Sequence, residues 1–574
     1  MIPRAIRRRP VAPDAVLPTG LHPVLARIYR ARNLSSTAEL DHSFDSLLSP
    51  MALKDIDRAV ALLAGTIEDQ RRILVVADFD ADGATSCALV VRALRSLGAH
   101  HVDYVVPNRF EYGYGLTPEI VALAAEREPD LLITVDNGIS SVEGVRAARA
   151  RGIAVLITDH HLPGPELPEA DAIINPNQRG CSFPSKNLAG VGVAFYCMLA
   201  LRARLRANGW FARRGLPEPN LARLLDLVAL GTVADLVPLD RNNRILVAQG
   251  IARVRSGLGC LGVRALAAVA GRRVDGLTAC DLAYAVAPRL NAAGRLTDMA
   301  LGIECLLADD ETRAHDMAVK LDGLNRERRV IEAEMQAQAL AALDALRLDA
   351  ASLPRGLCLH DDSWHQGVIG LVASRLKERL HRPVIAFAPS SDTDLKGSAR
   401  SIPGLHIRDA LDAVAARHPG LIARFGGHAM AAGLTLARAH LDAFRAAFDR
   451  EVSRLIAEDD LRGHVLTDGE LRDEELTLEV AQLLRDGGPW GQGFPEPLFD
   501  GSFEVVERRV VGERHVKLRV KQDGGRTFEA IGFHLAPTGE PPGWSRLRAA
   551  YRLDVNDYRG TRTLQLVLEH VEPS

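Results

Sequence analysis

Aspartates and histidines follow three apolar runs of the chain, at the points where residues 73–77, 131–135 and 153–157 end. The set comprises Asp78, Asp80, Asp82, Asp136, Asp159, His160 and His161. Five carboxylates in one place repel one another strongly unless cations neutralise them. Hard divalent ions accept oxygen and imidazole ligands. If the three runs are neighbouring strands, the set predicts two metal ions roughly 3.5–4 Å apart, an arrangement suited to in-line attack on a phosphodiester.

The apolar runs, together with residues 102–106, predict strands of one parallel sheet. Each run is almost continuously apolar, which is typical of strands buried on both faces. Helical stretches separate them, at 83–97, after Thr117 and near 142–150. In a doubly wound sheet the carboxyl ends of the strands lie side by side, where ligands bind. The pattern therefore predicts an α/β domain that brings the acidic residues together.

Other interpretations of the single motifs remain open. A D-x-D-x-D motif after a strand also suits a helix cap, a surface turn or a calcium loop. An EF-hand loop needs glycine at its sixth position and glutamate at its twelfth, and Gly83 meets the first condition whereas Leu89 fails the second. Asp235 follows a helical segment and a predicted Gly-Thr turn, so alone it suggests a helix-end cap. The repetition at three strand ends favours metal binding.

The rest of the chain predicts further domains. With 574 residues, 47% of them hydrophobic, the chain is too long for a single core. We expect mainly helices over 187–266, one or two long charged helices over 309–346, and a second α/β unit from about residue 356. Beyond about residue 468, short alternating strands predict a small β-barrel. The first 16 residues suggest a solvated tail.

Composition limits the class of protein. A net charge of −3 excludes a histone-like positive coat, so any contact with nucleic acid must come from a local groove. Seven cysteines without a C-x-x-C pair argue against a disulfide framework and fit a reducing cytoplasm. We expect no signal peptide and no membrane span, since the apolar runs fall short of the roughly 20 residues that a span needs.

The metal-binding set resembles the DHH phosphoesterases. Five further segments resemble motifs of the bacterial RecJ exonucleases, namely 107–115, 231–239, 288–295, 397–401 and 426–428. With a tail similar to that family's OB-fold, the resemblance covers most of the chain. It implies processive 5′ to 3′ removal of mononucleotides from single-stranded DNA with Mn²⁺ or Mg²⁺.

The resemblance also implies roles for single residues. The metal ligands would be Asp80, Asp82, Asp136, His160 and Asp235. His161 would stabilise charge at the scissile phosphate or protonate the leaving oxygen, and Asp78 and Asp159 would orient ligands. The predicted substrate contacts are Arg109, Tyr114, Arg289, Asn291, Arg295, Ser398, Arg400 and His428. A packing loop around Tyr114 and a buried structural role for His428 are the alternatives.

The predicted domains are an N-terminal extension packing on the core (1–65), the DHH catalytic domain (66–305), a helical connector (306–350), a DHHA1-type substrate-binding domain (351–455) and an OB-fold-like domain (460–574). On the barrel, His515, Lys517, Arg519 and Lys521 share one strand face, which suits either strand tracking or an ordinary solvated face. Family resemblance adds single-strand-binding protein and a RecQ-type helicase as partners of a monomer.

Two competing functions remain. A DHH enzyme for a small substrate, such as a pyrophosphatase or a short-oligonucleotide hydrolase, would be more compact than this chain. A non-catalytic DHH scaffold would be expected to have lost metal ligands, whereas every predicted ligand here is a competent side chain. Length and the complete ligand set therefore favour the exonuclease.

Overall fold

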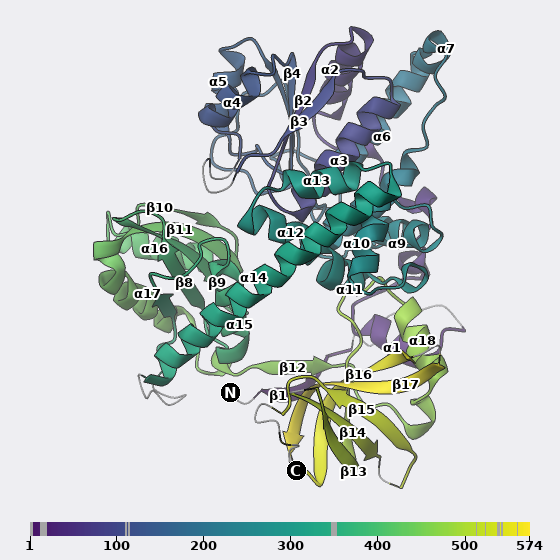
Figure 1. Ribbon diagram of the computed structural model, residues 1–574, viewed down its shortest axis with the longest axis vertical. Helices are drawn as coiled ribbons and strands as arrows, with labels where there is room; N and C mark the ends of the chain where they lie inside the picture. Colours follow the sequence, from purple (N-terminus) through teal and green to yellow (C-terminus); the bar gives the residue numbers. More distant parts are fainter. Residues whose placement is uncertain are drawn as a thin grey trace.

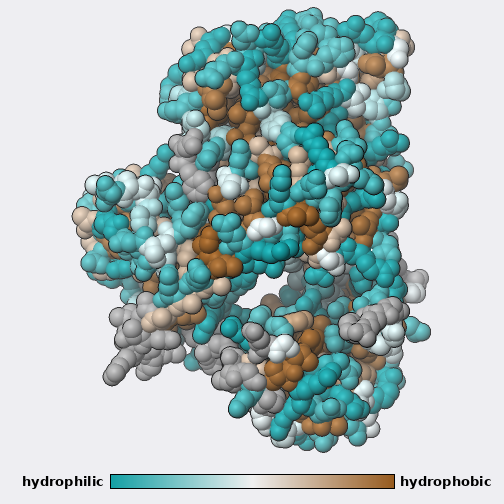
Figure 2. Space-filling view, viewed as in Figure 1, coloured by the Kyte–Doolittle hydropathy of each residue, from teal (hydrophilic) through white to brown (hydrophobic). Residues whose placement is uncertain are grey.

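The computed structural model describes residues 4–11, 20–108, 112, 115–345, 353–512, 514–522, 524–536, 540, 543–558 and 561–573. Figure 1 shows a parallel-sheet domain at the top, the long helix α14 (Glu311–Ala345) running diagonally below it, a small domain at the left and a barrel at the bottom. Figure 2 shows an opening between the barrel and the rest of the molecule. Within the described part of the chain, every helix is too short or too polar to pass through a bilayer.

The predicted parallel sheet is present. Its strands are β2 (Ile73–Ala77), β3 (Val102–Val105), β4 (Leu131–Val135), β5 (Ala154–Thr158) and β6 (Ala172–Ile174), in the order β3-β2-β4-β5-β6. All four pairings are parallel. Every residue of β2 and β4 is buried, as continuous apolar runs require.

Helices cover both faces of this sheet, because alternate residues of each strand point to opposite sides. On β2, Ile73 and Val75 join the core under α2 (Ile56–Glu68), α3 (Ala81–Ser96) and α6 (Gly190–Ala207), while Leu74 joins the core under α4 (Pro118–Ala125) and α5 (Val142–Arg149). Figure 1 shows these two groups of helices on either side of the strands.

The helical region after the sheet closes one side of the catalytic domain. It comprises α7 (Trp210–Arg214), α8 (Leu225–Ala234), α9 (Arg241–Arg255), α10 (Leu261–Val269), α11 (Ala279–Asp281), a π-helix (Leu282–Val286), α12 (Ala287–Leu296) and α13 (Ala300–Leu307). One prediction here was wrong. Gly231 and Thr232 form no turn before Asp235, since both lie within α8, whose last turn ends directly at Asp235.

The small domain has a mixed sheet in the order β10-β11-β9-β8-β7. Its strands are β7 (Leu357–His360), β8 (Val384–Pro389), β9 (Asp394–Arg400), β10 (Arg424–Gly427) and β11 (Ala431–Ala437), and its helices are α15 (Ile369–Leu380), α16 (Ile407–Arg417) and α17 (Leu441–Leu455). Helix α14 joins it to the catalytic domain, as the long charged run predicted.

The C-terminal strands close into a barrel, as predicted. They are β13 (Phe499–Val511), β14 (His515–Lys521), β15 (Thr527–Gly532), β16 (Arg546–Tyr558) and β17 (Thr561–Pro573), ordered β13-β14-β15-β17-β16, with α18 (Leu478–Asp486) beside them. The face of β14 expected to be basic is charge-compensated: Lys517 pairs with Glu529 at 2.8 Å, and Arg519 with Glu507 at 3.2 Å. This compensation favours the solvated-face interpretation.

The solvated tail predicted for the first 16 residues was wrong for residues 5–8, and residues 1–3 and 12–16 lie outside the described residues. Residues Ala5–Arg8 form β1, which pairs in parallel with β12 (His464–Thr467), and Ile6 is only 7% exposed. Helix α1 (Pro23–Arg30) follows. Arg32 then makes a buried pair with Asp468 at 2.8 Å. The N-terminal segment is therefore bound to the chain that leads into the barrel.

Candidate metal centre

The strand register sets three aspartates side by side. Ala77 of β2 lies level with Val135 of β4, which lies level with Thr158 of β5. The residues that follow are Asp78, Asp136 and Asp159. Parallel strands with level ends thus bring together side chains that are far apart in sequence, as predicted.

Seven predicted residues form three groups whose ligand atoms lie within 4.8 Å of one another. The groups are Asp136 with His160 and His161, Asp82 with His160 and Asp235, and Asp78 with Asp80 and Asp136. All five predicted ligands belong to this cluster. Asp78 and His161, for which we expected orienting and proton-transfer roles, meet the same geometric condition. Asp159 belongs to none of the three groups.

Helix α6 begins at the centre and holds Asp82. Its first two backbone N–H groups, of Gly190 and Val191, donate to the Asp82 carboxylate at 2.6 and 3.0 Å. A side chain at position 190 would place its Cβ 2.6 Å from the Cβ of Asp136. Glycine at this position therefore lets the helix approach two acidic residues at once.

Burial and mutual repulsion disfavour the ionised form of these carboxylates when no cation is bound. Burial, followed by the charge of Asp82, raises the pKa of Asp136 well above its usual value. Burial raises the pKa of Asp82 to about 7, with Asp235 as the next cause, and the pKa of Asp235 also to about 7. Cations placed among these groups would remove the repulsion, so the donor set fits divalent metal ions.

His160 is oriented as a metal ligand. Its Nε2 lies 3.1 Å from Asp136 Oδ1 and 3.4 Å from Asp235 Oδ2, yet this buried atom makes no hydrogen bond to any described residue. Burial, together with the nearby His161, lowers the pKa of His160. The ring is therefore neutral at pH 7, and a neutral ring offers the lone pair that a metal requires.

Backbone strain is concentrated at the same place. Asp136 has φ +62° and Leu236, directly after Asp235, has φ +59°. Non-glycine residues rarely adopt this left-handed conformation, and leucine least readily of the two. Such strain persists where surrounding structure enforces it, most often at functional sites.

Asp159 orients His161 through a hydrogen bond. Its Oδ1 accepts from the Nδ1 of His161 at 2.7 Å and from the backbone N–H of His160 at 2.7 Å, and its Oδ2 accepts from the N–H of Ile139 at 2.9 Å. Burial by itself lowers the pKa of His161, but the Asp159 carboxylate raises this pKa to about 9. His161 is thus a cation at neutral pH, with Nδ1 fixed and Nε2 turned away from Asp159.

Sequence reasoning missed two asparagines after β6. Asn175 Nδ2 donates to the backbone oxygen of His161 at 2.9 Å, and Asn177 Nδ2 donates to that of His160 at 2.6 Å. The signal was present as polar residues after the apolar run 172–174, but so short a run is too little to predict a strand. These asparagines fix the loop that presents both histidines.

Replacement of Asn177 by alanine should weaken metal binding. The substitution removes the hydrogen bond that positions the backbone of His160, and loss of such outer contacts typically costs about 10–100-fold in metal affinity or activity. Titration of the metal-free protein with Mn²⁺, followed by calorimetry, measures the effect. Unchanged affinity would show that the His160 loop is fixed without Asn177.

The small domain contributes to the same centre. The ring of His428, between β10 and β11, stacks 5.9 Å from the ring of His161. His428 is exposed, which rules out the buried structural alternative. Ala431 of β11 pairs with Arg400 of β9, and Arg400 Nη1 donates to Ser398 Oγ at 3.1 Å. The predicted Ser398–Arg400 cluster therefore lies in the strand beside the segment that faces the metal centre.

Comparison with known proteins identifies the family. The DHH family N-terminal domain matches residues 72–232, the DHHA1 domain 351–454 and the RecJ OB domain 467–570. The chain is 55% identical to the single-stranded-DNA-specific exonuclease RecJ of Dickeya dadantii and 52% identical to that of Escherichia coli, each over 99% of both chains. The chain belongs to the RecJ family. Its metal centre is accordingly that of a metal-dependent nuclease.

Solved RecJ structures agree in fold. The Mn²⁺ complex of RecJ from Thermus thermophilus has a TM-score of 0.79 and 30% identity, covering 96% of this chain and 76% of that chain. The Mg²⁺ complex from the same organism gives a TM-score of 0.73 at 29% identity. These matches over nearly the whole chain favour the exonuclease over the small-substrate and scaffold alternatives.

The remaining predicted substrate contacts lie in different surroundings. Asn291 accepts from the backbone N–H of Ala81 at 2.8 Å, beside Asp80. Arg295 donates to the backbone oxygen of Gly367 at 3.2 Å. Arg289 is largely buried and pairs with Asp322 at 2.8 Å. This ion pair joins α12 to α14. Arg109 and Tyr114 lie outside the described residues.

Proposed function

We propose that this chain hydrolyses single-stranded DNA from its 5′ end and releases 5′ mononucleotides, with two metal ions in the centre. The observation that carries the proposal is the cluster of five aspartates and two histidines gathered from the strand ends and the end of α8, faced by His428 of the small domain. Mn²⁺ or Mg²⁺ is the metal. Asp80, Asp82, Asp136, His160 and Asp235 would hold it, and Asp78 meets the same geometric condition.

When bound, the two ions would supply a hydroxide nucleophile and stabilise charge on the phosphate. The attacking oxygen forms the new P–O bond as the bond to the 3′ oxygen of the terminal nucleotide breaks. His161 is suited to donate a proton from Nε2 to that leaving oxygen, because Asp159 keeps the ring cationic and holds Nδ1. Asp159 therefore acts as a positioning residue.

Polarity would come from the small domain. Burial lowers the pKa of Arg400, and no acidic partner lies within ion-pair distance of it among the described residues. A half-buried guanidinium without an acidic partner favours a phosphate ligand. A terminal 5′ phosphate bound by Arg400 and Ser398 would fix one nucleotide between itself and the metals. Each cleavage leaves a new 5′ phosphate, so the strand can advance by one nucleotide.

Polarity is tested with single strands labelled at the 5′ or the 3′ end and with the matching blunt duplex. In Mn²⁺ or Mg²⁺ we expect the 5′ label to appear first as a mononucleotide, the 3′ label to remain on shortening strands, and no activity in EDTA. Blunt duplex should be spared. Equal attack at both ends, or on duplex, would overturn the proposed polarity.

The family resemblance also supports a cellular role. We expect the chain to act as a cytoplasmic monomer in recombination and mismatch repair, beside single-strand-binding protein and a RecQ-type helicase. The barrel domain, matched to the RecJ OB domain, supports binding of the single strand outside the catalytic centre.

A further inference from the structure

A buried hydroxyl group of β4 closes the loop that carries Asp136. The strand ends directly before this aspartate, and the loop turns through two residues with positive φ, Asp136 at +62° and Gly138 at +114°. Thr134, in β4, is 0% exposed, and its Oγ1 donates to the backbone oxygen of Asn137 at 2.7 Å. The strand therefore holds the loop that follows it through a side chain of its own.

The side chain of Asn137 joins the ends of two strands. It is 2% exposed, and its Nδ2 donates to the backbone oxygen of Val135 at 2.9 Å and to that of Val76, in β2, at 3.2 Å. The same oxygen of Val135 accepts from the backbone N–H of Asp78 at 3.3 Å. The amide therefore bonds to both strands just before the aspartates that follow them, Asp78 and Asp136.

Only the donor end of this amide has a partner in the described part of the chain. Asn137 Oδ1 is buried and accepts no hydrogen bond from any described residue. A buried acceptor without a partner costs stability, so it is retained where another part of the same group is needed. The N–H₂ group, which two backbone oxygens fix in one orientation, therefore explains asparagine at this position.

The same contacts stabilise a strained backbone. A Cβ at Gly138 would lie 2.5 Å from Thr134 Oγ1, so only glycine lets the hydroxyl reach the loop. Asp136 adopts a left-handed conformation that a non-glycine residue keeps only where surrounding structure enforces it. The hydrogen bonds made by Thr134 and Asn137 provide that enforcement on either side of Asp136.

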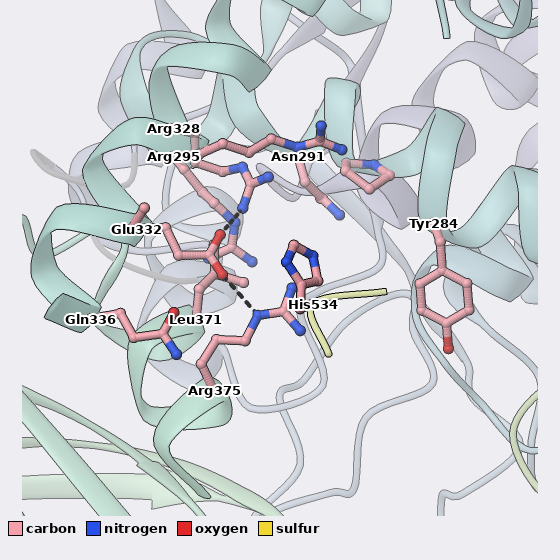
Figure 3. A pocket seen from close by; sticks show the side chains of 12 residues that line it. Tyr284, Asn291, Arg295, Arg328, Glu332, Gln336, Leu371, Arg375 and His534 are labelled. Carbon is pink, nitrogen blue, oxygen red and sulfur yellow. Dashed lines mark hydrogen bonds and ion pairs between the residues drawn. The ribbon is translucent and has the colours of Figure 1, made fainter. Parts of the chain in front are cut away.

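The loop after β2, which carries Asp80 and Asp82, is held from outside the sheet. The backbone N–H of Ala81 donates to Asn291 Oδ1 of α12 at 2.8 Å. Figure 3 shows Asn291 on the wall of a cavity of about 600 Å³ that α12 borders. That loop depends on a helix packed against the sheet, whereas Thr134 and Asn137 act within the sheet. Substitutions in β4 can therefore test the support of Asp136 by itself.

We infer that Thr134 and Asn137 are positioning residues, which hold the Asp136 carboxylate where the metal ions of this centre need it. Asp136 belongs to two of the three ligand groups, so a displaced carboxylate would disturb both. Loss of contacts that orient ligands weakens metal binding and activity even when every ligand is retained. The inference rests on the proposed function for its effect on cleavage, but metal binding is measured without a substrate.

Thr134→Val removes the hydroxyl group and keeps the branched shape of the side chain. We expect Mn²⁺ affinity, measured by calorimetry on the metal-free protein, to fall about 10–100-fold, the usual effect of losing such an outer contact. At saturating Mn²⁺ the kcat should also fall while KM for a single strand changes little, because no substrate contact is altered. Thr134→Ser keeps the hydroxyl group and should bind Mn²⁺ as the wild type does.

Thr66→Val is the matched control. Thr66 is 4% exposed, and its Oγ1 donates to the backbone oxygen of Leu62 at 2.8 Å within α2. The control loses the same kind of buried hydrogen bond and should lower the Tm to a similar extent, with Mn²⁺ affinity and kcat unchanged. Equal Mn²⁺ affinities of Thr134→Val and Thr66→Val, or a loss in Thr134→Ser as large as in Thr134→Val, would overturn the inference.

Asn137→Ala tests the second residue and keeps the inference testable if Thr134→Val does not fold. Its Mn²⁺ affinity should also fall about 10–100-fold. Because both residues act on one loop, the double variant should lose less affinity than the product of the two single losses. Losses that multiply in full would overturn the shared role. A wild-type protein that failed to shorten a single strand would overturn the proposed function instead, while the Mn²⁺ titrations would still decide the positioning roles.

Discussion

Asp136→Asn should abolish nuclease activity while making the metal-free protein more stable. The substitution removes the charge of a residue that is 2% exposed and belongs to two of the three ligand groups. Loss of a preorganised charge-stabilising group costs on the order of 10³-fold in kcat or more. Asparagine is the right replacement because it tolerates the φ of +62° at this position.

The gain in stability follows from the sign of the pKa shift. Burial and the charge of Asp82 raise the folded-state pKa of Asp136 above its unfolded value. Ionisation near pH 7 therefore costs more in the folded than in the unfolded chain, and asparagine removes that cost. In EDTA the Tm should rise by about 2 °C or more. The difference should vanish below about pH 3, where the carboxyl is protonated in both states.

Thermal unfolding with and without Mn²⁺ measures both effects. Metal that binds the folded state raises Tm, so the Mn²⁺-induced rise should shrink in the variant as its activity disappears. Asp130→Asn is the matched control, because Asp130 is exposed at the opposite end of β4, where its carboxylate accepts from the backbone N–H of Arg72 at 2.8 Å. A variant that kept a tenth of the wild-type activity would show that Asp136 is not a ligand.

The sheet and most of its acidic edge could be predicted because the strands are buried on both faces. The strands predicted at 73–77 and 131–135 match β2 and β4 residue for residue. The strand predicted at 153–157 begins one residue before β5. Continuous apolar runs indicate both the strand and its end, and the parallel register then dictates which side chains meet. Chemistry at the ends of such strands is therefore readable from local sequence.

The positions and contacts of residues outside the parallel strands could not be predicted in this way. Asp235 lies at the end of α8, and only the resemblance to a family raised it from a helix cap to a ligand, because helix packing is invisible in local pattern. β1 is short and largely polar, and its partner begins at His464, so nothing in its own sequence revealed a strand. Arg289 lies in the segment 288–295 that was expected to contact the substrate, yet it pairs with Asp322 of α14.

Asp159→Asn should have the opposite effect on stability from Asp136→Asn, although both substitutions remove one buried carboxylate from adjacent strand ends. Despite burial, the hydrogen bond and charge of His161 lower the pKa of Asp159. The ionised form is thus favoured by folding, and its contribution is present above the unfolded pKa and lost as the pH falls through the folded one. Asparagine also turns its amide N–H₂ toward the N–H of Ile139 or toward His161, leaving a donor without an acceptor.

We expect this variant to lose about 1–3 kcal/mol of stability in EDTA at pH 7. Its kcat should fall about 10²-fold or more, the contribution of a positioned proton donor, because the His161 ring loses the partner that keeps it cationic and oriented. Mn²⁺ affinity should fall by no more than the roughly 10–100-fold that loss of an outer contact costs, since Asp159 belongs to none of the three ligand groups. Chemical denaturation, single-turnover cleavage and Mn²⁺ titration measure the three quantities.

Asp171→Asn is the control for Asp159→Asn, an exposed aspartate that accepts from the backbone N–H of Val155 at 2.8 Å near the far end of the same sheet. A loss of Mn²⁺ affinity well beyond the roughly 100-fold that an outer contact costs would make Asp159 a ligand and remove the positioning role argued for it. Lower stability with metal binding retained would distinguish the two aspartates. The charge of Asp136 would then depend on a metal for stabilisation, whereas hydrogen bonds and His161 would stabilise the charge of Asp159.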